Sequence, residues 1–159
     1  MSDGFTLRPA TPADYEPIVE ALGEWMPAET VRILLPRSYL QRFAATSTVA
    51  WAESGEPGSP TELAGFLVAF PSPLHPEVGY VHFVWVAPQF RGCGLGTRLH
   101  RHAWATLAGL GCTTVEAVCS PANHGAIEFH EALGFGTRPA GAEVDLPGGE
   151  DVVVLTRAL

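Results

Sequence analysis

Apolar and polar residues alternate in short blocks along this chain of 159 residues, and glycine and proline separate the blocks. Alternation with a period of two among β-branched and aromatic residues is typical of strands, and apolar residues three or four apart are typical of an amphipathic helix. These periods predict strands over residues 5–8, 48–53, 63–70, 78–86, 113–119, from 135 onward and over 151–157. They predict helices over residues 11–22, 38–45, 95–110 and 122–133.

This order of elements, β-α-α-β-β-β-α-β-α-β-β, predicts an α/β (α+β) fold with a mixed, mostly antiparallel sheet of about seven strands and about four flanking helices. Gly, Pro and Ser at 55–60 favour a hairpin between the second and third strands. Pro147, Gly148 and Gly149 favour a turn inside the closing strand pair. The length suits one domain over residues 1–159.

Composition narrows the class of protein. The chain is 47% hydrophobic and 16% charged, which is typical of a globular protein. No apolar run approaches the roughly 20 residues of a membrane-spanning helix. Residues 1–8 lack the layout of a signal peptide, and three cysteines cannot all pair within one chain. We therefore expect a cytoplasmic protein.

The charge of the chain is strongly acidic. Nine arginines and no lysine stand against 17 acidic residues, for a net charge of −8. This argues against nucleic acid and anionic membranes as the main partners. It favours a cationic partner, although solubility alone would also explain such a charge.

The strongest chemical signal is a glycine-rich segment between a predicted strand and a predicted helix. Residues 91–97 read Arg-Gly-Cys-Gly-Leu-Gly-Thr. Bare backbone at a helix start brings several N–H groups and the positive end of the helix dipole to one anion, so we expect a pyrophosphate here. A P-loop is excluded because it needs a lysine, and the G-x-G-x-G spacing does not fit a dinucleotide fingerprint.

The spacing does match another motif. Arg91, Gly94 and Gly96 form Arg-x-x-Gly-x-Gly, preceded by Val86 and Pro88, and this resembles the acyl-CoA-binding motif of the GCN5-related N-acetyltransferases (the GNAT family). The resemblance implies the acetyltransferase fold over essentially the full length, with the sheet splayed between its fourth and fifth strands. A tight turn with packing glycines is the alternative, but it does not explain three glycines beside an arginine.

The resemblance implies acetyl-CoA as the acyl donor and no metal. Backbone N–H groups of the loop would bind the pyrophosphate, with charge from Arg91 and a hydroxyl from Thr97. Main-chain groups of the preceding strand would pair with pantetheine. The implied cofactor-binding residues here are Val84, Trp85, Val86, Arg91, Gly92, Cys93, Gly94, Leu95, Gly96 and Thr97.

A second block, from Asn123 to Phe135, is similar to the family pattern N-x-x-A-x-x-F-Y-x-x-x-G-F. The resemblance implies that Asn123 and Phe129 lie at the cofactor, although Asn123 is also a good helix N-cap. His130 stands where relatives often have a tyrosine that protonates the leaving thiolate. An imidazole can serve as this general acid, and a surface histidine without a role is the alternative.

His82 is the candidate general base. It lies on the strand before the loop, and a period of two predicts that it shares the face of Val84. A protonated amine must lose a proton before it attacks a thioester, although a lone histidine in an apolar strand is more often a core residue. Tyr80 and Glu116 are weaker candidates. Cys93 and Cys119 have no base beside them in sequence, so we expect no acetyl-cysteine.

The resemblance thus implies an N-acetyltransferase that passes acetyl directly to a primary amine. In relatives the acceptor enters between segments that correspond to 23–37 and 142–151. Acidic residues in these segments, with Trp25 and Met26, favour a small cationic amine, a polyamine or a basic peptide end. The acidic residues are Glu24, Glu29, Glu143, Asp145, Glu150 and Asp151. A non-catalytic acyl-CoA-binding module and a transferase of longer acyl groups remain alternatives. Family members often form homodimers.

Overall fold

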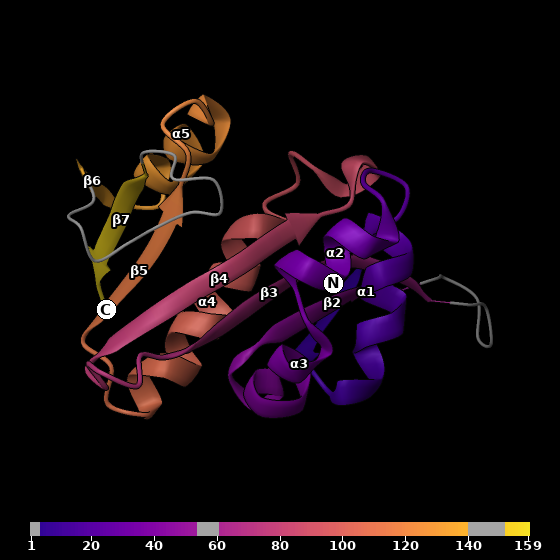
Figure 1. Ribbon diagram of the computed structural model, residues 1–159, viewed down its shortest axis with the longest axis horizontal. Helices are drawn as coiled ribbons and strands as arrows, with labels where there is room; N and C mark the ends of the chain where they lie inside the picture. Colours follow the sequence, from indigo (N-terminus) through magenta and orange to yellow (C-terminus); the bar gives the residue numbers. More distant parts are fainter. Residues whose placement is uncertain (1–3, 54–60, 140–151) are drawn as a thin grey trace.

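The computed structural model describes residues 4–53, 61–139 and 152–159, and within these ranges seven strands form one sheet (Figure 1). The strands are β1 (Phe5–Pro9), β2 (Thr48–Ala52), β3 (Glu62–Pro71), β4 (Val78–Val86), β5 (Thr114–Cys119), β6 (Gly136–Pro139) and β7 (Val153–Ala158). The α-helices are α1 (Tyr15–Leu22), α2 (Ala28–Leu34), α3 (Arg37–Phe43), α4 (Leu95–Gly109) and α5 (His124–Ala132). The sheet order is β1-β2-β3-β4-β5-β7-β6. The predicted mixed sheet is confirmed.

The sheet opens between β4 and β5, the one pair of neighbours in the described sheet that is parallel. Their pairing covers only Val78–Val81 of β4 and Thr114–Ala117 of β5. Past this point the two strands diverge, which Figure 1 shows as a widening gap between their ribbons. The predicted splay is therefore confirmed, and within the described ranges the last five residues of β4 have no strand partner on this side.

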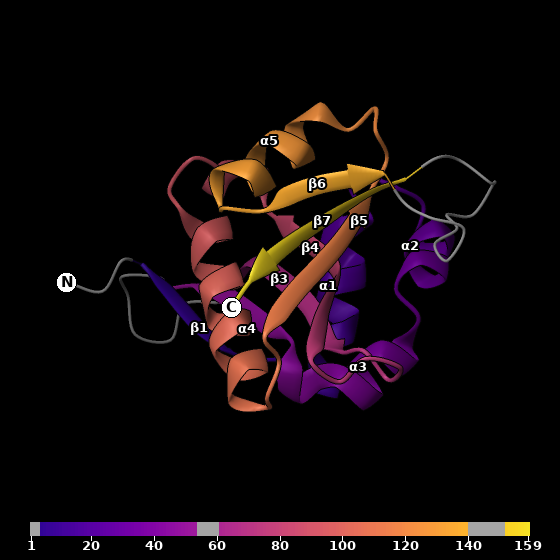
Figure 2. The ribbon, with the colours of Figure 1, turned by 90° about the vertical axis from the view of Figure 1, so that its left-hand side faces the viewer.

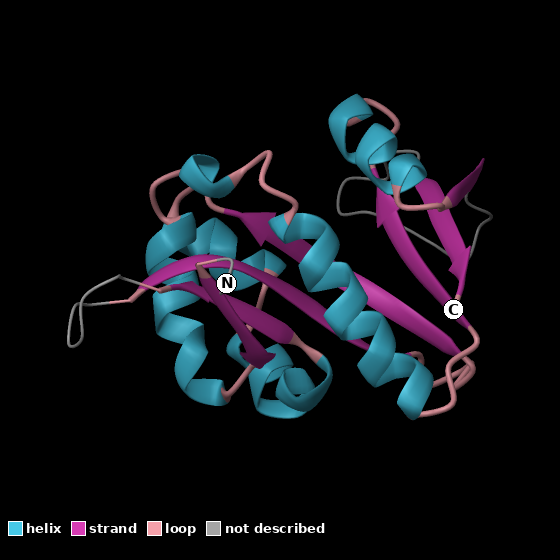
Figure 3. Ribbon diagram, turned by 180° about the vertical axis from the view of Figure 1, so that it is seen from behind, coloured by secondary structure: helices cyan, strands magenta, loops and turns pink. Residues whose placement is uncertain are grey.

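Each face of the sheet carries its own hydrophobic core. On one face α4 packs through Leu95, Leu99, Ala103 and Leu107, spaced three or four residues apart, as an amphipathic helix requires. On the other face α1, α2 and α3 pack over a second cluster that includes Phe66. Figure 2 shows α4 on one side of the sheet with α2 and α3 on the other, and Figure 3 shows α4 crossing the rear of the sheet.

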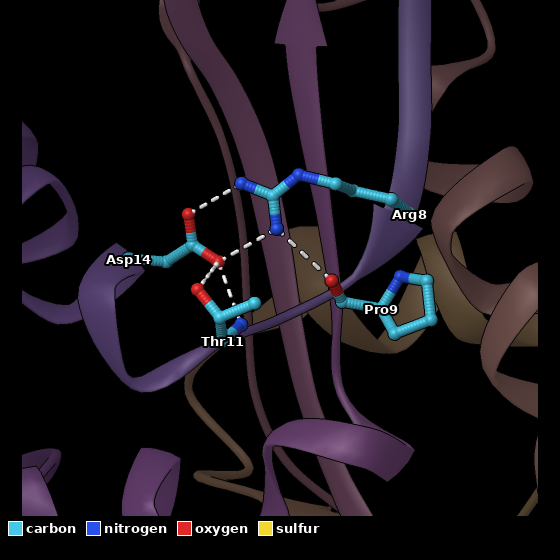
Figure 4. Close-up of polar contacts among 4 residues, drawn as sticks. All are labelled: Arg8, Pro9, Thr11 and Asp14. Carbon is cyan, nitrogen blue, oxygen red and sulfur yellow. Dashed lines mark hydrogen bonds and ion pairs between the residues drawn. The ribbon is translucent and has the colours of Figure 1, made fainter.

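A partly buried ion pair connects β1 to the start of the first helical segment (Figure 4). Arg8 donates to both carboxylate oxygens of Asp14, at 2.9 and 2.7 Å, and Thr11 donates its backbone N–H to Asp14 Oδ2 at 2.7 Å. Burial raises the pKa of Asp14, but these hydrogen bonds outweigh it and hold the pKa below its usual range. The contact therefore ties the chain direction after β1 to α1.

The structure corrects the predicted number of helices from about four to five within the described residues. The additional helix, α2, lies in a stretch where the periodicity predicts no helix. This helix has only seven residues, and prolines stand at Pro27 and Pro36 on either side of it. It buries Val31 completely, so tertiary packing stabilises a helix too short for periodicity to reveal. The predicted turns at 55–60 and 147–149 lie outside the described residues.

The structure also corrects the face on which His82 lies. Val68 and Ala69 of β3 pair with Phe83 and Val81 of β4, so His82 is the extra residue of a β-bulge. The bulge reverses the alternation, and Val81 and Val84 both face the α4 side. His82 instead stacks on Tyr39 of α3, with ring centroids 4.3 Å apart. It therefore does not share the face of Val84.

In the part of the chain that the structure describes, no helix is both long and apolar enough to cross a lipid bilayer.

Candidate active site

The glycine-rich loop lies at the start of α4, as its sequence predicts. Gly92 and Gly94 adopt φ angles of +79° and +82°, which L-residues with a side chain rarely adopt. A Cβ at Gly96 would lie 2.9 Å from the ring of Phe129. Two glycines thus serve the turn, and the third lets α5 approach α4. The exposed backbone left at this helix start is suited to an anion.

A cavity of about 710 Å³ opens beside this loop. Its wall consists of the end of β4, the loop, the first turn of α4 and one side of α5. The lining residues are Val84, Trp85, Val86, Phe90, Arg91, Gly92, Gly94, Leu95, Gly96, Thr97, Gly125, Ala126, Phe129 and His130. The structure therefore brings together ten of the twelve residues predicted to bind the cofactor, with Cys93 and Asn123 outside the lining.

The loop offers hydrogen-bond donors to an anion. The first N–H groups of a helix have no partner within it, and α4 begins at Leu95, so the amides of Leu95, Gly96 and Thr97 face the helix entrance. Arg91 donates from Nε to the carbonyl of Val86 at 3.0 Å, which holds its guanidinium beside the cavity. Amides, helix dipole and guanidinium together favour a phosphate group here.

The open edge of β4 adds a second kind of contact. Because pairing with β5 ends at Val81, backbone groups on that edge of residues 82–86 have no strand partner among the described residues. Val84, Trp85 and Val86 lie in this segment and line the cavity. An extended molecule with amide groups can therefore add to this edge as a further strand would.

Asn123 caps α5. Its Oδ1 accepts the backbone N–H of Ala126 at 3.2 Å, and the residue itself is exposed. This is the N-cap role that the sequence left open as an alternative. The side-chain N–H₂ group is not used in this contact, so its predicted role at the cofactor stays a prediction.

His130 is buried, with 5% of its surface exposed, and it lines the cavity. Its Nδ1 lies 2.7 Å from the carbonyl of Ala126. A carbonyl only accepts, so Nδ1 carries the proton and the neutral ring has a bare Nε2. Burial lowers the pKa of His130, against the opposing effect of the hydrogen bond to Ala126. The alternative of an exposed surface histidine does not hold.

A second buried histidine faces His130 from α4. His100 is fully buried, its Nδ1 lies 2.8 Å from the carbonyl of Gly96, and the two imidazole centroids are 5.3 Å apart. Neither Nε2 has a hydrogen-bond partner among the described residues. Burial lowers the pKa of His100 to about 4. The pair is therefore neutral near pH 7.

His82 lies outside the cavity, on the face of the sheet that carries α2 and α3. Its Nε2 is 2.7 Å from the carbonyl of Leu34, so Nε2 donates and Nδ1 keeps its lone pair. The ring is only half-buried. The imidazole can therefore accept a proton at Nδ1, from the side of the sheet opposite α4.

The weaker candidates lie lower on the same two strands. Tyr80 of β4 pairs in register with Glu116 of β5, and both line a smaller cavity together with Arg138. Burial, with the nearby charges of Tyr39 and Glu116, raises the pKa of Tyr80. Glu116 forms an ion pair with Arg138 at 4.0 Å. At neutral pH Tyr80 thus holds its proton.

All three cysteines are described, and all are free thiols. Cys93 is exposed and donates from Sγ to the carbonyl of Phe90 at 2.9 Å. Burial raises the pKa of Cys119, which disfavours its thiolate. Neither thiol is activated for attack on an acyl group.

Four residues of this region were not predicted from sequence. Phe90, Gly125 and Ala126 line the cavity, and His100 packs against His130. Ala126 belonged to the second motif and could have been included on that ground. His100 follows the loop on the buried stripe of α4, but periodicity could not show which ring of α5 it meets.

These features define a cavity with an anion-binding loop at one end and an open strand edge along it, and comparison with known proteins gives the class of protein. A model of the acetyltransferase (GNAT) family matches residues 15–135, most of the chain. The chain belongs to this family.

Individual relatives agree with this assignment. The chain is 42% identical to an uncharacterised N-acetyltransferase of Methanocaldococcus jannaschii over 59 residues, which is 37% of this chain and 26% of that protein. The fold is similar to NAA60 of Arabidopsis thaliana in complex with a bisubstrate analogue, at a TM-score of 0.73 and 18% identity over 98% of this chain and 99% of that one. It is also similar to the diaminobutyrate acetyltransferase EctA of Paenibacillus lautus, in complex with L-2,4-diaminobutyric acid and coenzyme A. There the TM-score is 0.65 and the identity 18%, over 95% of this chain and 93% of that one.

Proposed function

We propose that this protein is an acetyl-CoA-dependent N-acetyltransferase that transfers acetyl directly to a primary amine. The observation that carries the proposal is the single cavity in which the anion-binding loop, the open edge of β4 and His130 meet. Acetyl-CoA supplies the acetyl group as an activated thioester. The described lining of this cavity contains no cysteine or serine to hold the acetyl group, which favours direct transfer.

The lining residues fit the parts of acyl-CoA. The amides of Gly92 to Thr97, with Arg91, would hold the pyrophosphate, and the backbone of residues 82–86 would bind pantetheine. The apolar side chains of Val84, Val86 and Phe129 would cover the pantetheine chain. Each group of the cofactor thus has donors or apolar surface of matching chemistry.

We propose that His82 removes the proton of the incoming ammonium group. Its Nδ1 keeps a lone pair, because Nε2 donates to Leu34. The residue lies at the bulge where β4 leaves β5, on the face of the sheet that carries α2 and α3. The acceptor would reach it from the side of α2, directly or through a water molecule.

His130 would supply the proton for the departing thiolate. Its Nδ1 proton is engaged by Ala126, so only Nε2 can give one, and only after the ring has gained it. Since burial lowers the pKa of His130, the resting ring is neutral. We therefore infer that Nε2 takes up the second proton, which the attacking nitrogen loses as it becomes the amide, and passes it to the thiolate as the C–S bond breaks.

We propose a small cationic amine or a basic peptide end as the acceptor. The net charge is −8, Glu24 lies in the α1–α2 connection and Glu29 in the first turn of α2. The other acidic residues of the expected entrance, Glu143, Asp145, Glu150 and Asp151, lie outside the described residues. The structurally similar EctA is bound to its substrate L-2,4-diaminobutyric acid, so a small diamino acceptor occurs on this fold.

Other parts of the proposal concern the setting of the enzyme. Three free thiols fit a reducing compartment, and we place the protein in the cytoplasm on that ground. The acidic charge disfavours nucleic acid and anionic membranes as partners. We retain a single domain and a homodimer as hypotheses.

The test is release of free CoA from acetyl-CoA across matched amines. A diamine and a basic dipeptide should be turned over, and an acidic dipeptide of the same length at least tenfold more slowly. Equal turnover would contradict a cationic acceptor. Calorimetry that finds no CoA binding would contradict the whole proposal. Tight CoA binding without release on any amine would favour a non-catalytic module, and release only from longer acyl-CoA would favour another donor.

A further inference from the structure

A second cavity, of about 300 Å³, lies beside α1. The end of α1, the facing ends of β2 and β3, and the connection from β4 to Gln89 enclose it. The lining residues are Pro17, Glu20, Ala21, Glu24, Trp25, Trp51, Thr61, Glu62, Leu63, Trp85, Ala87, Pro88 and Gln89. Only Trp85 is shared with the cofactor cavity. Of the other wall residues, Glu24 and Trp25 also belong to segment 23–37 of the expected acceptor entrance, and no proposed proton-transfer step uses this wall.

The cavity is acidic. Glu20, Glu24 and Glu62 line it, and the lining includes no arginine, lysine or histidine. Glu62 accepts a hydrogen bond from Gln89, while Glu20 and Glu24 form no ion pair within the described part of the chain. Glu20 lies on α1 and Glu24 follows the end of this helix, so two negative charges share one wall and repel each other. A bound cation would remove that repulsion.

The cavity is also unusually aromatic. Three of the four tryptophans of the chain line it, Trp25, Trp51 and Trp85. Trp51 and Trp85 pack on the core, whereas Trp25 is 57% exposed, although burial would favour so large an apolar side chain. The indole N–H of Trp51 is buried without a hydrogen-bond partner among the described residues. A ligand with an acceptor group could supply that partner.

Indole faces and carboxylates together are the chemistry that recognises organic cations. The ring quadrupole attracts a cation over its face, most strongly for tryptophan. Apolar walls also tolerate the alkyl groups of an organic ammonium ion better than the water shell of a metal ion. We propose that this cavity binds a small organic ammonium ion, at a site that adjoins the expected acceptor entrance through Glu24 and Trp25. Its volume is at the lower end of the range for small-molecule sites.

The experiment titrates the protein with choline chloride, without acetyl-CoA and against matched sodium chloride, by calorimetry and tryptophan fluorescence. The neutral isostere 3,3-dimethylbutan-1-ol has the same shape without the charge. We expect saturable one-to-one binding of choline and at least tenfold weaker binding of the isostere. Equal affinities, or a response that does not saturate, would overturn the proposal.

Variants locate the binding. Trp25→Leu keeps an apolar side chain at an exposed position, and Glu24→Gln removes one charge. Each should weaken choline binding about threefold to thirtyfold, the range that cation–π and charge contacts give. Glu131→Gln, at an exposed position on α5, is the matched control and should leave binding unchanged. Unchanged affinity in both cavity variants would refute the site. These readouts do not depend on acetyl transfer, so the proposed function can fail or hold independently.

Discussion

His100 on α4 and His130 on α5 use their rings in the same way. Each donates from Nδ1 to the carbonyl four residues earlier, of Gly96 and of Ala126. Each leaves Nε2 buried and without a partner within the described residues. In each ring the single proton of the neutral imidazole is therefore on Nδ1, and the ring becomes charged only when Nε2 takes up a second proton. Two residue-scale predictions follow from this arrangement, one for stability and one for catalysis.

His100 should make the fold sensitive to acid. Its pKa is about 4 in the folded state and near 6.5 when unfolded, so between these values the unfolded chain binds more protons. Stability is then lost as the pH falls from 6.5 toward 4. Urea unfolding should show roughly 2 kcal/mol less stability from this residue at pH 5 than at pH 7.

The His100→Phe variant isolates this contribution, because it keeps the ring volume and removes the titration. Its stability should fall less than that of the parent between pH 7 and pH 5. His124→Gln, at an exposed position of α5, is the control and should keep the parent's pH dependence. Equal slopes in the parent and the His100 variant would show that burial does not depress this pKa.

His130 should act on turnover rather than on binding. His130→Phe keeps a buried ring but removes Nε2, so kcat should fall by about 10²-fold, the lower range for loss of an acid–base group, while CoA affinity changes little. His130→Tyr places a phenol where the family often has one and should restore part of kcat. Steady-state kinetics and CoA calorimetry measure the two effects. A phenylalanine variant with unchanged kcat would exclude a role for His130 in proton transfer.

At the scale of elements, the start of α4 decides whether the loop can bind an anion. Gly94 is the N-cap residue and has a φ of +82°, in the left-handed region. An alanine there costs about 1–2 kcal/mol in backbone strain. If the backbone shifted to relieve that strain, the amides of the first helical turn would no longer be directed at one anion. The conformation of Gly94 thus determines both where α4 starts and how the loop amides are directed.

Gly94→Ala should therefore lower the free energy of unfolding by about 1–2 kcal/mol and weaken CoA binding at least tenfold. Gly109→Ala is the matched control at the other end of α4, where a Cβ meets nothing within 4 Å. It should be neutral or stabilise by up to about 1 kcal/mol and leave CoA binding alone. Chemical unfolding and calorimetry measure both variants. CoA binding that Gly94→Ala does not change would separate the loop from the cofactor.

At the scale of the whole molecule, the proposed cofactor site lies where β4 and β5 diverge, and the cores on both faces of the sheet stabilise the strands around it. β4 keeps its partner β3 from Gly65 to Pro71 but loses β5 after Val81. The helices on the two faces pack on separate cores, so the strands can diverge without exposing either core. A ligand that pairs with the open edge completes the sheet.

Hydrogen exchange should report this completion. On addition of CoA, the amides of residues 82–86 should gain protection, because a hydrogen-bonded amide exchanges only when it opens. Amides of Val78–Val81 are already paired with β5 or β3 and serve as the internal control. Exchange monitored by mass spectrometry resolves the two segments. Equal changes in both, or none in either, would contradict pairing along β4.

The sequence pattern predicted most of the fold because its elements are locally encoded. The buried stripe of α4 has helical spacing and begins at the glycine loop, and β4 is a long β-branched and aromatic run. It did not predict α2, whose stability comes from burying Val31. The sequence pattern also placed His82 on the wrong face. The bulge depends on pairing with β3, and a strict period of two along one strand does not reveal it.

By itself, the sequence determined the order of the strands and of every α-helix except α2, the glycines that the loop requires, and the family, since these depend on residue type and spacing along the chain. Only the tertiary structure decided which side chains meet. It directed His82 toward Tyr39, placed His130 against His100, and brought three tryptophans and three glutamates from separate elements around one cavity. The physical reason is that burial, tautomer and proximity depend on contacts between segments far apart in the chain, and local periodicity carries no information about them.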